Sequence, residues 1–298
     1  MSTILDILKK YRSKLDQLDL ELIIAYGINK PREFVLTHPE YKLVKSQKSK
    51  VKSYLLRRMK HEPLAYILEE KEFYGLKFKV NKNTLIPRPE TEMMVDLVLE
   101  KIRKTKHKLQ DTRIVDIGTG SGNIIIAIAK SLLNHELRIM NYALCGIDIN
   151  TKTLSVAKYN AKLNKVDKKI NFLQGNLLEP IFKKMSLVTS HWSLIITANL
   201  PYLSPEIYSS CSKDIKNYEP KSALVSQKEG LMHYEKLLRQ LVTSHWSLVT
   251  CFFEISPEQK IKIFNLIKKY FPEGKIIFHK DLSRRWRVCQ LEIRSAKS

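Results

Sequence analysis

The four residues Asn199-Leu200-Pro201-Tyr202 carry groups that could bind a planar amino group. They follow the apolar run LIITA, which predicts a buried strand, so they would lie at its carboxyl end. An amide NH2 is a poor nucleophile because its lone pair is delocalised, and acceptors for its two hydrogens would orient it for methylation. The carbonyl oxygens of Asn199 and Leu200 suit that task, while Pro201 and Tyr202 would shape the slot and Tyr202 would pack on the flat face. The alternative is a plain Asn-led turn in which proline ends the strand.

A glycine-rich turn follows another predicted strand in the segment Ile114–Gly122, IVDIGTGSG. Its three glycines would let the backbone approach a ligand over the strand end. The dinucleotide fingerprint needs glycine at position 123, where this chain has asparagine, so a pyrophosphate cradle is the weaker interpretation. Asp148 ends the next predicted strand, and its carboxylate could accept both hydroxyls of a ribose. Each feature alone also fits a structural loop or a helix cap, but together and in this order they favour a nucleoside cofactor.

The elements that would position these residues follow from the hydrophobic period. Residues 1–70 repeat apolar positions at three- and four-residue steps, which predicts helices and a small helical domain. Residues 72–85 alternate aromatic and β-branched residues with lysine, which predicts a β-hairpin between two domains. From residue 86 onward, buried strands alternate with helices. This alternation predicts an α/β fold with a parallel sheet covered on both faces.

The composition indicates a sizeable core and a strongly basic chain. Its 298 residues, 44% of them hydrophobic, suffice for one large or two modest domains. The formal net charge of +22 fits either an anionic or RNA-containing partner or a lysine-rich solvated surface. The longest strongly apolar run, Ile124–Ala129, is too short to span a bilayer, and the charged N-terminal sequence does not fit a signal peptide. Four widely spaced cysteines form no zinc or disulfide pattern, so we expect a cytoplasmic protein without a metal site.

One octapeptide, LVTSHWSL, occurs twice, at Leu187–Leu194 and at Leu241–Leu248. Each copy precedes a strand-like run. Eight residues are too few for a solenoid unit, so we favour a duplicated segment over a shared folding role. We assign no chemistry to the histidines and tryptophans of the repeat.

Four longer strings carry a resemblance to a known enzyme family. They are EPLAYILEEKEFYGLKFKV (Glu62–Val80), LIPRPETEMMVD (Leu85–Asp96), DIGTGSG (Asp116–Gly122) and NYEPKSALVSQKEGLMHY (Asn217–Tyr234). On these strings the chain resembles, over nearly its whole length, the protein-(glutamine-N5) methyltransferases that modify class 1 peptide chain release factors. PRPETE is close to diagnostic of this branch, whereas DIGTGSG occurs across enzymes that use S-adenosylmethionine.

The resemblance implies a Rossmann-like S-adenosylmethionine-dependent methyltransferase domain with a small helical N-terminal domain. The implied boundaries are residues 1–71 for a helical substrate-docking domain, 72–85 for the hairpin linker and 86–298 for the catalytic domain. The implied reaction is methyl transfer from S-adenosyl-L-methionine to the side-chain amide nitrogen of the glutamine in the Gly-Gly-Gln motif of a release factor. We expect a cytoplasmic monomer with a protein substrate, and a nucleic-acid partner is possible without being required.

The resemblance also assigns site residues. The cofactor loop of the family maps onto Gly118, Thr119, Gly120, Ser121 and Gly122, its ribose-binding acid onto Asp148, and its adenine-side positions onto Asn176 and Leu177. Its Asn-Pro-Pro-Tyr motif maps onto Asn199, Leu200, Pro201 and Tyr202, which would bind and position the substrate, with Asn199 also facing the cofactor.

Three positions depart from the family pattern. Asn176 stands where the family usually has an acid, so an uncharged amide oxygen would have to bind the adenine amino group. Leu200 replaces the first proline of the motif, and Ser256 stands where the family prefers glycine. Reduced activity is one consequence that these departures allow. Two alternatives stay open: a glutamine methyltransferase of a ribosomal protein, and an adenine-N6 methyltransferase of RNA or DNA, in which Asn-Leu-Pro-Tyr also occurs.

Overall fold

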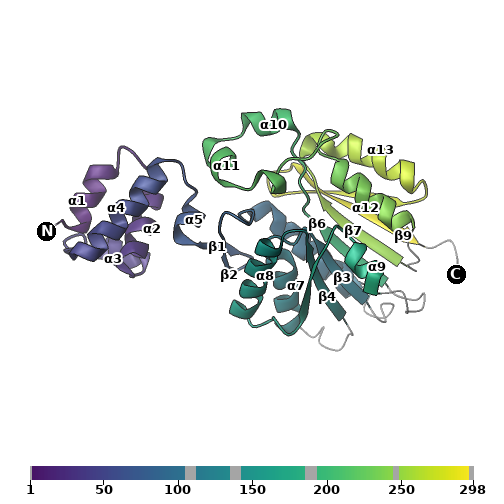
Figure 1. The fold of residues 1–298 in the computed structure, drawn as a ribbon, viewed down its shortest axis with the longest axis horizontal. Helices are drawn as coiled ribbons and strands as arrows, with labels where there is room; N and C mark the ends of the chain where they lie inside the picture. Colours follow the sequence, from purple (N-terminus) through teal and green to yellow (C-terminus); the bar gives the residue numbers. More distant parts are fainter. Residues whose placement is uncertain (1, 105–111, 135–141, 185–192, 244–247, 295–298) are drawn as a thin grey trace. The chain divides into compact units, whose positions relative to one another are not determined.

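The computed structural model describes residues 2–104, 112–134, 142–184, 193–243 and 248–294 (Figure 1). The chain divides into two compact units, which we call the helical unit (Met1–Glu70 with Cys211–Glu219) and the sheet unit (Lys71–Ser210 with Pro220–Ser298). The boundaries expected from the sequence place Cys211–Glu219 with residues 86–298, whereas these residues pack with the helical unit. Most of the octapeptide repeat, including His191, Trp192, His245 and Trp246, lies outside the described residues. None of the helices in the described ranges is both long enough and apolar enough to cross a bilayer.

The helical unit is built from short helices around one apolar core. In chain order they are α1 (Ile4–Tyr11), α2 (Gln17–Ile28), α3 (Arg32–Thr37), α4 (Lys45–Met59) and α5 (Leu64–Leu68). Side-chain caps fix two of the starts: Thr3 and Asp6 form a capping box on α1, and Asp16 accepts from backbone amides of α2. Ile23, Ile24 and Val51 belong to the buried core. The three- and four-residue apolar spacing thus produces the predicted helices.

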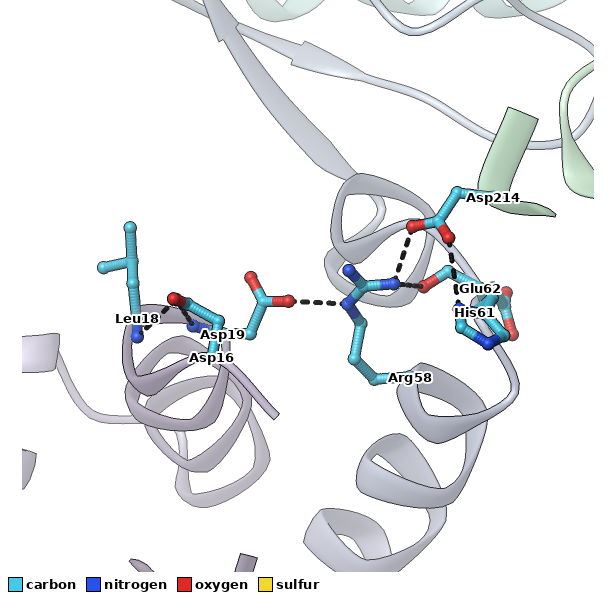
Figure 2. Close-up of polar contacts among 7 residues, drawn as sticks. All are labelled: Asp16, Leu18, Asp19, Arg58, His61, Glu62 and Asp214. Atoms are coloured by element: carbon cyan, nitrogen blue, oxygen red, sulfur yellow. Dashed lines mark hydrogen bonds and ion pairs between the residues drawn. The ribbon is translucent and has the colours of Figure 1, made fainter. Parts of the chain in front are cut away.

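A segment distant in sequence completes this unit. Helix α11 (Lys213–Tyr218) lies within it, and Figure 2 shows how Arg58 of α4 bonds two acidic side chains. The Arg58 Nε donates to Asp19 Oδ2 at 2.6 Å, and its Nη1 donates to Asp214 Oδ2 at 2.8 Å. The Tyr218 hydroxyl donates to the backbone carbonyl of Lys60 at 2.8 Å. The charge-assisted bond of Arg58 to Asp214 and the bond of Tyr218 to Lys60 fasten α11 to the end of α4.

The sheet unit contains a seven-stranded sheet with the order β5-β4-β3-β6-β7-β9-β8 (Figure 1). Five strands are parallel, as predicted: β3 (Thr112–Ile117), β4 (Tyr142–Asp148), β5 (Ile170–Gln174), β6 (Ser193–Ala198) and β7 (Leu248–Glu254). Two further strands, β8 (Lys275–Lys280) and β9 (Trp286–Arg294), complete the sheet, and β9 runs antiparallel to both of its neighbours, β7 and β8, which the prediction of a parallel sheet did not include. The five residues between β8 and β9 are too few for a crossover, so this pair can only form a hairpin.

Both faces of the sheet are covered because successive residues of a buried strand point to opposite sides. Ile114 belongs to the core shared with α6 (Glu92–Lys104), α7 (Asn123–Asn134) and α8 (Thr151–Leu163). Its neighbour Val115 belongs to the opposite core, shared with α9 (Glu179–Lys184), α12 (Met232–Val242) and α13 (Lys260–Tyr270). The near-continuous apolar composition of β3, β6 and β7 follows from this double burial.

Shorter elements surround the sheet. The hairpin expected in residues 72–85 forms from β1 (Glu70–Phe73) and β2 (Leu76–Lys79). Helix α10 (Pro205–Ser210) and the 3-10 turns η1 (Pro89–Thr91), η3 (Lys221–Ala223) and η4 (Pro257–Gln259) connect the larger elements. From β3 the chain adds β4 and β5 on one side, then returns to place β6 on the other side of β3 and β7 beyond it. The strand order therefore reverses between β3 and β6. The carboxyl ends of these two strands are where open α/β sheets bind ligands.

Candidate active site

A cavity of about 330 Å3 lies over the carboxyl ends of β3, β4, β5 and β6 in the sheet unit. Four consecutive strand ends contribute to its lining, which includes Gly118–Ser121, Asp148, Asn176, Leu177 and Asn199–Pro201. The structure therefore brings most of the sequence-predicted site residues to one place. Of the predicted set, Gly122 and Tyr202 are not among the described residues that line the cavity.

The glycine loop after β3 approaches the cavity with its backbone. Gly118 has φ +69° and Gly120 has φ +57°, a region that side chains other than glycine rarely adopt. A Cβ on Gly118 would come within 3.0 Å of the Leu200 Cδ2, so the loop and the Asn199–Tyr202 motif are in van der Waals contact. A Cβ on Gly120 would have only the Gly118 carbonyl oxygen nearby, at 3.8 Å, and would project into open space. The loop is thus shaped to admit a ligand against its backbone.

A buried carboxylate below the loop braces it. Asp116 accepts hydrogen bonds from the hydroxyls of Thr119, at 2.7 Å, and of Thr197, at 2.8 Å. Burial raises the pKa of Asp116 to about 6, and the two hydroxyl donors oppose that rise. Asp116 therefore ties the loop to β6 and is itself withdrawn from solvent. Gly122, with φ +81°, directly precedes α7, and a Cβ there would lie 3.2 Å from the Cβ of Ala157 on α8, so this glycine allows the two helices to pack closely.

Asp148 stands at the end of β4, between the loop and α8. Its Oδ2 accepts from the backbone amide of Gly120 at 3.1 Å, and its Oδ1 accepts from that of Asn150 at 2.9 Å. Burial raises the pKa of Asp148, whereas these backbone donors lower it. Each carboxylate oxygen has a second lone pair, so Asp148 can hold the loop and still accept hydroxyl groups from a ligand.

The segment after β5 presents an amide to the same cavity. The Asn176 Nδ2 donates to Glu179 Oε1 at 2.9 Å, which leaves the Asn176 Oδ1 as the acceptor end of the amide. Leu177 has φ +54°, which is uncommon for a side chain of its size. Such strained residues cluster at ligand sites.

The motif after β6 is held by contacts on several sides. The Asn199 Nδ2 donates to Glu254 Oε2 at 2.8 Å and to Thr91 Oγ1 at 3.3 Å. Leu200 is buried, and the backbone carbonyl of Tyr202 accepts from the Gln259 side chain at 3.0 Å. The Tyr202 ring packs with the apolar core beside α12 and α13. Burial, followed by the neighbouring Glu254 carboxylate, raises the pKa of Tyr202 well above its ordinary value.

The structure adds residues that the sequence analysis did not assign to the site. The segment Lys82–Leu85, Pro87, Arg88 and Thr91 lines the cavity, as do Pro220, Ser222, Ala223 and His233. Leu85, Pro87, Arg88 and Thr91 come from the string LIPRPETE, which Lys82–Thr84 directly precede, and the second group comes from NYEPKSALVSQKEGLMHY; both strings entered the sequence interpretation only as marks of a resemblance. Ser256 lies buried at the start of η4, and Glu254 at the end of β7 contacts the motif.

Comparisons with known proteins agree with this architecture. A model described as PrmC N-terminal domain matches residues 3–68, and one described as Methyltransferase domain matches residues 108–271. The chain is 32% identical to a release factor glutamine methyltransferase of Clostridium botulinum, covering 95% of this chain and 94% of that protein. It is 30% identical to the protein of the same name from Bacillus subtilis, covering 98% of each.

Among solved structures, the chain is similar to the catalytic domain of hMettl16 in a complex with the MAT2A 3'UTR hairpin 6. The TM-score is 0.52 at 16% identity, and the match covers 81% of each chain. At this identity the likeness concerns the fold alone, which is that of a methyltransferase domain.

Proposed function

We propose, since this chain belongs to the release factor glutamine methyltransferase family, that it methylates the side-chain amide nitrogen of the glutamine in the Gly-Gly-Gln motif of class 1 peptide chain release factors. The methyl donor in this proposal is S-adenosyl-L-methionine. A translation factor as substrate would place the enzyme in the cytoplasm.

One observation carries the proposal: Asn199 and Leu200 line the cavity at the carboxyl end of β6, beside the glycine loop. In the proposal, the Asn199 side-chain oxygen and the Leu200 backbone carbonyl are the two acceptors. A glutamine side chain offers two amide hydrogens, and two acceptors would hold its nitrogen in a fixed orientation toward the methyl group. Its delocalised lone pair gains nucleophilicity when the amide hydrogens are held by strong acceptors.

The residues around the cavity fit the proposed cofactor. Gly118 and Gly120 form a cradle without side chains, Asp148 has free lone pairs for ribose hydroxyls, and the Asn176 Oδ1 can accept from the adenine amino group. When bound there, S-adenosylmethionine supplies a methyl group on a sulfonium, which is a good leaving group. The protein then has to orient the amide, exclude water and accept the amide hydrogens. The amide proton can leave to solvent after transfer, so we assign no strong general base.

The departures noted in the sequence fit this scheme. At position 200 the proposal uses only the backbone carbonyl, and the leucine side chain packs against Gly118. At position 176 the acceptor is an amide oxygen, and Glu179 binds the other end of that amide. Both positions can therefore serve without the proline or the acid that the family pattern has.

A methyl-transfer assay with labelled S-adenosylmethionine tests the proposal. Purified release factor, a variant of it with alanine in place of the loop glutamine, and ribosomal RNA are offered in parallel. We expect label on the unmodified release factor alone. Label on the RNA would refute the proposal and favour an adenine methyltransferase. Label on the release factor variant that carries alanine in place of the loop glutamine would show that the glutamine amide nitrogen is not the target atom.

The role of Asn199 has a separate test. Asn199→Ala should lower turnover at least about 100-fold, since it removes an acceptor that acts on the reacting nitrogen, while calorimetry shows nearly unchanged cofactor binding. Near-normal turnover of this variant would rule out the positioning role.

A further inference from the structure

The buried carboxylate of Glu254 has no role in the proposed methyl transfer described so far, yet it contacts Asn199, the residue proposed to position the substrate amide. Glu254 ends β7, and both it and Thr91 are 1% exposed. Its Oε2 accepts from the Asn199 Nδ2 at 2.8 Å and from the Thr91 hydroxyl at 2.7 Å. The Asn199 Nδ2 also lies 3.3 Å from the Thr91 Oγ1. A buried ion is costly unless hydrogen bonds compensate it, so its position beside the motif requires a reason.

The hydrogen-bonding capacities of these groups allow only one orientation of the Asn199 amide. An ionised carboxylate can only accept hydrogen bonds, so it must face the NH2 end of the amide. The Thr91 hydroxyl uses its hydrogen on Glu254, so its oxygen is left to accept from the same NH2. If the amide turned by 180°, the Asn199 Oδ1 would face two acceptors. The Oδ1 is thereby directed away from Glu254 and Thr91.

This orientation is the one that a substrate amide needs, because only the Oδ1 can accept its hydrogens. We infer that Glu254, together with Thr91, is a positioning residue that fixes the Asn199 amide with its oxygen toward the substrate. The inference rests on the proposed function, in which that oxygen binds the glutamine side chain. Glu254 is not among the described residues that line the cavity, so it acts through Asn199 and does not touch the substrate.

The surroundings of Glu254 make its charge dependent on pH. Glu90 and Arg287 act on it through charge, the Tyr202 hydroxyl donates to its carboxylate, and the Tyr234 hydroxyl donates to its backbone carbonyl. Burial is the largest influence and raises the pKa of Glu254 to about 7. A protonated carboxyl could donate to the Asn199 Oδ1 and so permit the wrong orientation. The fraction of correctly oriented enzyme should therefore rise with pH.

The test compares Glu254→Gln with wild type in the release factor assay. A glutamine at this position can donate to the Asn199 Oδ1 and so removes the restriction on orientation. We expect kcat to fall at least about 10-fold, while KM for the release factor and the dissociation constant of S-adenosylmethionine change less than about threefold. The kcat of wild type should rise between pH 6 and pH 8, and the variant should lack this rise.

Thr91 and a second glutamate supply matched controls. Thr91→Val should lower kcat, and Thr91→Ser, which keeps the hydroxyl, should restore it. Glu292→Gln makes the same chemical change on β9, where Glu292 pairs with Lys101 and does not contact the motif, and should leave kcat unchanged.

Each outcome bears on the inference. A Glu254→Gln enzyme with kcat within about twofold of wild type would overturn it, as would equal loss in Thr91→Val and Thr91→Ser. Wild-type enzyme that methylates no release factor would overturn the proposed function and the inference with it. Active wild type with an unaffected Glu254→Gln variant would overturn the inference alone.

Discussion

Ionisation of Glu254 should lower the stability of the sheet unit as the pH rises, and the substitution Glu254→Gln should remove this pH dependence. Burial raises the pKa of Glu254 from 4.5 to about 7. Below pH 4.5 the carboxyl is neutral in both the folded and the unfolded chain and contributes nothing. As the pH rises toward 7 the unfolded chain loses this proton first, so the folded state is progressively disfavoured.

The magnitude follows from the same two values. A tenfold change in an ionisation equilibrium corresponds to about 1.4 kcal/mol, so the full penalty is about 3 kcal/mol and is reached above pH 7. Glutamine at position 254 does not ionise. The stability of Glu254→Gln relative to wild type should therefore increase with pH, by about 2 to 3 kcal/mol between pH 5 and pH 8. Other titrating groups are common to both proteins and cancel in this difference.

Urea unfolding at several pH values measures this difference. Tryptophan fluorescence suits the purpose because Trp286 begins β9 of the sheet unit. Glu292→Gln is the control: although burial opposes it, Lys101 lowers the pKa of Glu292, so its contribution changes only below the range studied. A difference between Glu254→Gln and wild type that stays constant from pH 5 to pH 8 would refute the reasoning.

Three further substitutions test other parts of the structure. Gly230→Ala should destabilise the protein by about 2 to 4 kcal/mol, since its φ is +84° and a Cβ would lie 1.9 Å from the Tyr202 carbonyl oxygen; unchanged thermal unfolding would contradict this close approach. Asp148→Ala should weaken binding of S-adenosylmethionine by about 1.5 to 3 kcal/mol in calorimetry, and unchanged affinity would exclude the ribose contact. Arg58→Met removes the guanidinium that pairs with Asp214. The free energy that holds α11 in place should fall by about 1 kcal/mol after solvent screening, so the amide hydrogens of α11 should exchange about fivefold faster. Equal exchange rates would show that the ion pair does not hold the helix.

The sequence predicted those parts of the fold and site that depend on neighbouring residues. The strand Thr112–Ile117, its glycine turn and the helix after it follow from local periodicity and from the conformations that glycine permits. Asp148 and Asn199 were found because each ends an apolar strand. Residues at the carboxyl ends of parallel strands meet at one edge, so their convergence on one cavity could be anticipated.

The contacts of Asn199 could not be predicted in the same way. In sequence, Thr91 lies 108 residues from Asn199 and Glu254 lies 55 residues from it. The contact with Glu254 depends on β6 and β7 being neighbours in the sheet, and the contact with Thr91 depends on where the segment before α6 packs. The string PRPETE held polar residues in an unusual pattern, but no periodicity indicates where such a segment packs. The antiparallel pair β8 and β9 was likewise left out, since the alternating strands and helices before it continue the parallel pattern.

The composition of the helical unit from two separate stretches of chain restricts how evolution or an engineer can recombine this protein. Residues 1–70 look like a self-contained module in the sequence, but Asp214 and Tyr218 supply bonds to Arg58 and Lys60 at its last long helix. A chimera that exchanges only the first 70 residues between relatives would combine α4 of one protein with α11 of another. Exchange of the helical unit therefore has to occur at two places in the gene at once, or between relatives in which the aspartate and the arginine are both retained.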